Sequence, residues 1–117
     1  MSLTKKEIRV KLQKAVGKQV KFDYPGGIDS KRGCVRDRVI VWSGISRSGA
    51  VYWDVVDLIE FPHEKHKRWI RIGYYRQVGD KLGWAGQTTI TEPRHIMKRI
   101  FAEAAKRKWF REVLPRA

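Results

Sequence analysis

The sequence predicts an α+β protein: a small antiparallel β-barrel, or a strongly curved sheet, of about five strands with an N-terminal and a C-terminal helix. Three observations lead to this fold class. Apolar residues recur at helical spacing near both ends of the chain, whereas between about residues 18 and 91 they alternate with a period of two. The strand-like segments are separated by short corners rich in glycine, which favour hairpins. At 117 residues the chain is expected to form a single domain, 1–117.

The first element is a helix over about residues 4–16. Thr4 and Glu7 have the spacing of a capping box, in which each side chain binds a backbone N–H near the other residue. Apolar residues then follow at helical intervals, which predicts one buried stripe. The stripe consists of Ile8, Leu12, Ala15 and Val16.

Five segments rich in β-branched and aromatic residues follow, and each is bounded by glycine, proline or serine. They are residues 18–24, 33–42, 51–61, 68–77 and 84–91. The second segment changes its alternation near Arg36 to Arg38, so it is either one long bent strand or two short ones. A closing helix is expected over about residues 93–113, with Pro93 in its first turn and a broad apolar face.

The segment 68–77 carries the main functional signal. Side chains on a strand alternate between two faces, and one face is expected to join the core. That face carries Ile70, Ile72 and Tyr74, and the opposite face carries Trp69, Arg71, Gly73, Tyr75 and Gln77. Flat aromatic rings beside a guanidinium group are typical of surfaces that bind nucleobases and phosphates. We therefore expect Trp69 and Tyr75 to be exposed, whereas Trp53 and Trp109 are expected to fill the interior.

The charge of the chain supports the same interpretation. It has 26 Lys and Arg residues against 12 Asp and Glu, a net charge of +14 that favours association with polyanions. Phosphates are held by cations spread over a surface, so clustered basic residues are the candidates. We expect them to be Lys31, Arg32, Arg36, Arg38, Lys67 and Arg68. Together with Trp69, Arg71 and Tyr75 they predict a non-enzymatic module that binds DNA or RNA.

Two other functions remain open. Asp23, Asp29 and Lys31 have the order found in metal-dependent nucleases, where carboxylates hold a metal and a lysine orients water. The third possibility is a protein-interaction subunit of a nucleoprotein assembly, with a protein partner or a homo-oligomer. His63 and His66 are too isolated to favour a metal site.

Several classes of function are disfavoured. No apolar run approaches ~18 residues, and charges stand where a signal peptide would be apolar, so neither membrane insertion nor secretion is expected. A single cysteine, Cys34, fits a reducing cytoplasmic location. No catalytic or cofactor-binding motif is present, so no cofactor is expected. The strand spacing is loosely similar to that of SH3-like barrels, a fold that hosts many functions.

Overall fold

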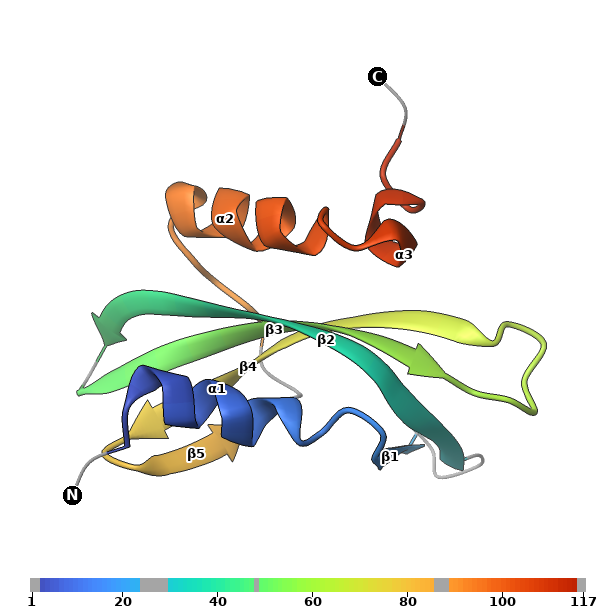
Figure 1. The fold of residues 1–117 in the computed structure, drawn as a ribbon, viewed down its shortest axis with the longest axis horizontal. Helices are drawn as coiled ribbons and strands as arrows, with labels where there is room; N and C mark the ends of the chain where they lie inside the picture. Colours follow the sequence, from blue (N-terminus) through green and yellow to red (C-terminus); the bar gives the residue numbers. More distant parts are fainter. Residues whose placement is uncertain (1–2, 24–29, 48, 86–88, 116–117) are drawn as a thin grey trace. The chain divides into compact units, whose positions relative to one another are not determined.

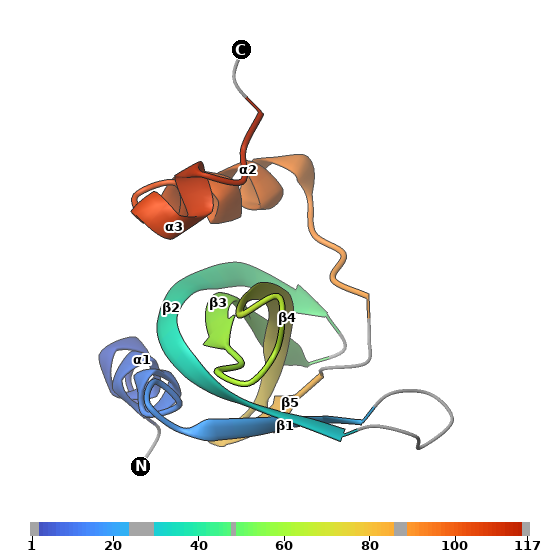
Figure 2. The ribbon, with the colours of Figure 1, turned by 90° about the vertical axis from the view of Figure 1, so that its right-hand side faces the viewer.

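The computed structural model describes residues 3–23, 30–47, 49–85 and 89–115, with the side chains of 21–23, 30–31 and 45–47 outside this description. The helices are α1 (Lys5–Gln13), α2 (Arg94–Ala104) and α3 (Lys108–Arg111). The strands are β1 (Gln19–Asp23), β2 (Ser30–Arg47), β3 (Ala50–Glu60), β4 (Arg68–Val78) and β5 (Lys81–Trp84) (Figure 1). They form one curled antiparallel sheet (Figure 2) in the order β1-β2-β3-β4-β5, which confirms the predicted α+β class. The predicted position of the last strand, 84–91, is wrong: a two-residue turn at Gly79 and Asp80 already lets Lys81 pair with Val78, so β5 begins three residues earlier and ends at Trp84.

The chain divides into two compact units. The α1 unit consists of Thr4–Arg38 and Asp57–Arg71, and the α2 unit consists of Met1–Leu3, Val39–Val56 and Ile72–Ala117. The three longest strands, β2, β3 and β4, contribute residues to both units.

The N-terminal helix begins as predicted. The backbone N–H of Glu7 donates to Thr4 Oγ1, and the N–H of Thr4 donates to Glu7 Oε1, both at 3.1 Å. This capping box satisfies two donors that a helix start leaves without intrahelical partners. The helix buries Ile8 and Leu12, the expected stripe, and ends at Gln13, earlier than the predicted residue 16.

The α1 unit has a small apolar core where β2 and β3 meet. Val35, Ile59 and Phe61 are buried there, and Val16 and Val20 pack against them. Gly33 lies against the same core, because a Cβ atom at this position would be 2.8 Å from both Ile59 Cγ2 and Phe61 Cε1. The close approach explains why a glycine stands in the middle of a strand. The strand β2 is continuous past Arg36 and Arg38, which settles the choice between one strand and two.

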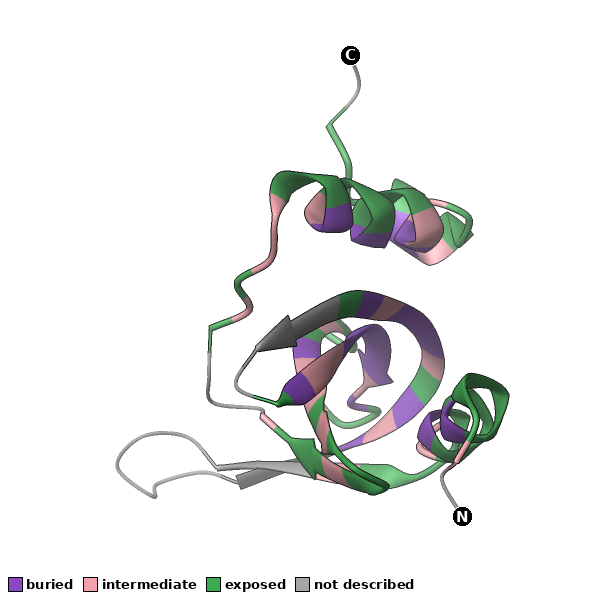
Figure 3. Cartoon of the chain, turned by 90° about the vertical axis from the view of Figure 1, so that its left-hand side faces the viewer, coloured by how far each residue is buried: buried purple, intermediate pink, exposed green. Residues whose placement is uncertain are grey.

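The α2 unit is built on the central strand β3 and the helix α2. Trp53 is fully buried, as expected, and its ring lies 6.4 Å from that of Trp42 at 47°. The buried face of α2 consists of Ile96, Ile100 and Ala104 (Figure 3). The predicted closing helix is divided, because a turn at residues 105–107 separates α2 from α3. In the part of the chain that the structure describes, none of the helices has the length and apolar character needed to cross a membrane.

Candidate nucleic-acid interface

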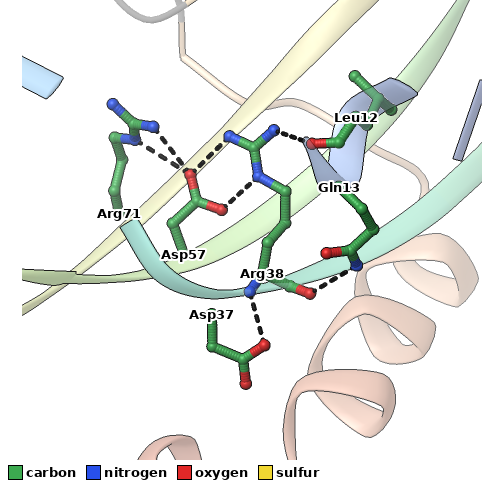
Figure 4. A network of polar contacts seen from close by, with 6 residues as sticks. All are labelled: Leu12, Gln13, Asp37, Arg38, Asp57 and Arg71. Atoms are coloured by element: carbon green, nitrogen blue, oxygen red, sulfur yellow. Dashed lines mark hydrogen bonds and ion pairs between the residues drawn. The ribbon is translucent and has the colours of Figure 1, made fainter. Parts of the chain in front are cut away.

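A buried cluster of charges lies in the α1 unit (Figure 4). Both oxygens of the Asp57 carboxylate accept from Arg38, with Nε to Oδ1 at 2.7 Å and NH2 to Oδ2 at 2.9 Å. Arg71 donates to the same Oδ2 from NH2 at 2.9 Å and from Nε at 3.3 Å. The exposed fractions are 1% for Arg38, 0% for Asp57 and 20% for Arg71. One carboxylate therefore holds two guanidinium groups, and one of these reaches the surface.

The position of Arg38 differs from the predicted one. The sequence predicts a phosphate contact there, but the side chain is enclosed, and its NH1 donates to the carbonyl oxygen of Leu12 at 3.0 Å. A guanidinium bound to a carboxylate and a helix carbonyl in the interior has no surface to offer a ligand. Arg38 is therefore a core residue and is not part of the candidate interface.

The remaining predicted cations of the α1 unit lie at its surface where the structure describes them. Arg32, Lys67 and Arg68 are exposed. Arg36 is also exposed, and its NH2 lies 3.0 Å from Glu60 Oε1 in a surface ion pair. The side chain of Lys31 lies outside the described residues.

Trp69 is exposed, as predicted, with 45% of its surface accessible. Its indole is nevertheless fixed at two points. Nε1 donates to the carbonyl oxygen of His66 at 2.7 Å, and the ring contacts Phe61 edge to face with centroids 5.8 Å apart. The residues next to it, from Lys65 to Arg68, are all exposed, and Lys65, Lys67 and Arg68 are cations. A held aromatic ring and several cations thus share one short segment.

In the α2 unit, the two faces of β4 are assigned differently from the prediction. Ile72, expected in the core, is 43% exposed, whereas Gly73 on the opposite parity is buried. On the same face of β4 as Gly73, Gln77 Oε1 accepts a hydrogen bond from Nε1 of the buried Trp53 at 2.7 Å. The prediction for Ile72 is wrong because the face with Gly73 receives large side chains from neighbouring strands. A glycine on a strand indicates such a close approach.

Tyr75, the last predicted site residue, lies in the α2 unit beside Trp84. The two residues are Cα partners in the β4–β5 ladder, and their rings lie 4.9 Å apart at 53°. Tyr75, which was predicted to be exposed, is half-buried because it packs against Trp84, and Trp84 is the more accessible of the two at 40%. The structure thus groups Trp69 with Arg71 in one unit and Tyr75 with Trp84 in the other.

Sequence reasoning missed the role of Asp57. The available signal was its position within an apolar segment of β3, where Val55, Val56, Leu58 and Ile59 are all buried around it. A charge in such a run is rarely buried without partners of opposite charge. The partners themselves, Arg38 and Arg71, are distant in sequence.

The residues of the nuclease hypothesis are not described. Asp29 lies outside the described residues, as do the side chains of Asp23 and Lys31. Among the residues that the structure does describe, no three His, Cys, Asp or Glu side chains gather as a metal site would require. His63 and His66 are both exposed.

Comparison with known proteins gave no match: no family model fits the chain, and no curated protein or solved structure is significantly similar to it. No relative therefore suggests a ligand or an activity.

Proposed function

We propose that this chain is a non-enzymatic nucleic-acid-binding module whose interface includes Trp69 and the cations around it. The observation that carries the proposal is the exposed indole of Trp69 beside exposed Lys67 and Arg68. An exposed tryptophan with a fixed orientation is a stacking surface for a base, and the adjacent cations suit its phosphates.

The fixed orientation of Trp69 favours binding. Stacking of a base on an aromatic side chain contributes ~1–3 kcal/mol. The hydrogen bond to His66 and the edge contact with Phe61 restrict the ring before any ligand arrives. A ring that is already ordered loses less conformational freedom on binding, so more of the stacking energy appears as affinity.

Arg71 stays in the proposed interface with a defined orientation. Asp57 holds its NH2 and Nε, and about a fifth of the side chain remains accessible, at 20%. A guanidinium held in this way is preorganised for a phosphate oxygen. The exposed Arg32 and Arg36 add positive charge in the same unit.

The direct test is a panel of single- and double-stranded DNA and RNA, measured by fluorescence anisotropy at several salt concentrations. We expect binding that weakens steeply with salt and depends little on sequence. Trp69→Ala should weaken binding to the best ligand roughly tenfold, since one stacking contact is lost. Phe101→Ala removes another exposed aromatic, from α2, and is the matched control. Wild-type protein that binds none of the four ligands at low salt would refute the proposal.

A role as a protein-interaction subunit of a nucleoprotein assembly is the second candidate. The observation that favours it is a set of exposed apolar side chains in and after the C-terminal helices. They are Phe101, Val113 and Leu114. Sedimentation velocity of the isolated chain over a range of concentrations would detect a homo-oligomer, and capture of a separate protein partner would follow only if the chain is monomeric.

We further propose that the curled sheet is a barrel of the SH3-like type and that the protein works in a reducing, cytoplasmic environment. The five-strand order and the free thiol of Cys34 support these two assignments. Neither assignment bears on the choice of ligand, because SH3-like barrels host many functions.

A further inference from the structure

The hairpin of β4 and β5 carries an aromatic surface that the chain forms before any ligand binds. A Cβ atom on Gly73 would collide with Trp84 Cη2 and lie 3.1 Å from Cζ2 and Cζ3. The six-membered ring of Trp84 therefore rests directly on the backbone of Gly73. Tyr75, the ladder partner of Trp84, closes one side of the ring at a centroid distance of 4.9 Å.

This packing leaves much of the indole accessible, because Trp84 is 40% exposed although the strand backbone supports it from beneath. A large aromatic ring that is both supported and exposed differs from a core residue, which would lie between two covered faces. It also differs from a mobile surface side chain, because Gly73 and Tyr75 fix its plane. The ring thus presents a rigid flat surface at the edge of the sheet.

From this geometry we infer that Trp84 is a stacking platform for an unpaired base, so that the α2 unit binds single-stranded nucleic acid. The inference rests on the proposed nucleic-acid-binding function and adds a second site and a ligand class to it. In a duplex each base is covered by its neighbours, and only an unpaired base offers a face to an aromatic side chain.

The charges of the hairpin agree with a polyanionic ligand. Arg76 and Lys81 are exposed and pair in the ladder with Gly83 and Val78. They alternate with Tyr75 and Trp84 along the strands and so lie on the opposite face of the hairpin. Because β5 is an edge strand of the sheet, the long side chain of Lys81 can reach phosphates that pass beside the edge. Asp80 is also in this hairpin, and its Oδ1 accepts from the backbone N–H of Leu3 at 2.8 Å.

The experiment measures anisotropy of a labelled oligothymidylate and of a labelled DNA duplex with the full chain and four variants. Trp84→Ala removes the ring, and Gly73→Ala keeps the ring but forces it off its support. Trp84→Phe retains a smaller aromatic surface. Val78→Ala, an exposed position on β4 like Gly73 but on the opposite face of the hairpin from Trp84, is the matched control.

We expect Trp84→Ala and Gly73→Ala to weaken oligothymidylate binding roughly tenfold to hundredfold and to change duplex binding by less than about twofold. The oligothymidylate affinity of Trp84→Phe should stay within about tenfold of the wild-type affinity, because a smaller aromatic ring remains. The affinity of Val78→Ala should equal that of the wild type. Circular dichroism verifies that each variant is folded. If Trp84→Ala does not fold, Gly73→Ala alone tests whether the supported ring of Trp84 contributes to binding.

Two results would overturn the inference while leaving the proposed function intact: unchanged oligothymidylate affinity in folded variants, or equal losses for single strand and duplex. Wild-type protein that binds neither of these ligands, and neither single- nor double-stranded RNA, at low salt would instead refute the proposed function itself. The two failures are therefore distinguishable.

Discussion

Asp57 binds Arg38 through both of its carboxylate oxygens, and both side chains are buried, at 0% and 1% exposure. Removing charges from water is costly, so such a pair persists only when its hydrogen bonds are well made. Here the carboxylate is bound by Arg71 as well, and Arg38 also donates to the end of α1. The loss of either partner would leave a charge uncompensated in the interior.

We therefore expect Asp57→Asn to lower the free energy of unfolding by about 3–5 kcal/mol, since two guanidinium groups lose their anion. Urea unfolding followed by tryptophan fluorescence measures this. Glu60→Gln is the matched control, because it removes a carboxylate from the exposed pair with Arg36 and should cost less than about 1 kcal/mol. Equal effects of the two substitutions would contradict the structural role of Asp57.

Thr4→Ala is expected to destabilise the protein by about 1 kcal/mol, because the Glu7 backbone N–H loses its acceptor at the start of α1. The measurement is the urea midpoint at an unchanged slope. Lys5→Ala, one residue later and exposed, should leave the midpoint nearly unchanged. A midpoint for Thr4→Ala equal to that of the wild type would argue that the capping box contributes nothing to stability.

Gly33→Ala should cost about 1–3 kcal/mol, because its methyl group would lie 2.8 Å from Ile59 Cγ2 and Phe61 Cε1 in the core of the α1 unit. Gly83→Ala is the control on another strand, where the nearest heavy atom to the new methyl group would be the Arg76 carbonyl oxygen at 3.9 Å. Thermal unfolding of the two variants should separate them by several degrees. Stability of Gly33→Ala at the wild-type level would mean that β2 and β3 shift apart at little cost.

The combined substitution Lys67→Gln and Arg68→Gln should make nucleic-acid binding less salt-dependent. Each phosphate contact contributes about −0.7 to −0.9 to the slope of log affinity against log salt, so the slope should become shallower by about 1.5. Arg94→Gln with Lys98→Gln removes the same charge from α2, where both residues are exposed. That control should keep the wild-type slope, and a slope equally reduced in both double variants would argue against an interface centred on Trp69.

Local signals were the ones that sequence analysis interpreted correctly. The capping box depends on two residues three positions apart, and the first four strands follow from alternation and from glycine-rich corners. The fifth strand was placed too late in the chain, at 84–91 instead of Lys81–Trp84. The burial of Trp53 and the exposure of Trp69 were also predicted. Each of these features is set by residues close together in the chain.

Arg38 and Ile72 were misassigned because their surroundings come from distant segments. The carboxylate that draws Arg38 inward belongs to Asp57 on another strand, and alternation alone gives no sign of it. The face of β4 opposite Ile72 is occupied by Trp84 from β5, which rests on Gly73. Alternation divides a strand into two faces but does not say which of them the neighbouring strands will cover.

Two hydrogen bonds join the end of α1 to the strand β2, and in each of them a side chain of one element donates to a backbone carbonyl of the other. Arg38 donates to the carbonyl of Leu12, and Gln13 Nε2 donates to the carbonyl of Arg38 at 3.1 Å. A protein trimmed through Gln13 would therefore lose more than one turn of surface helix. Water would then reach the buried cluster of Arg38, Asp57 and Arg71. Replacing the side chain at position 12 could not reproduce this defect, because the acceptor at Leu12 is its backbone carbonyl.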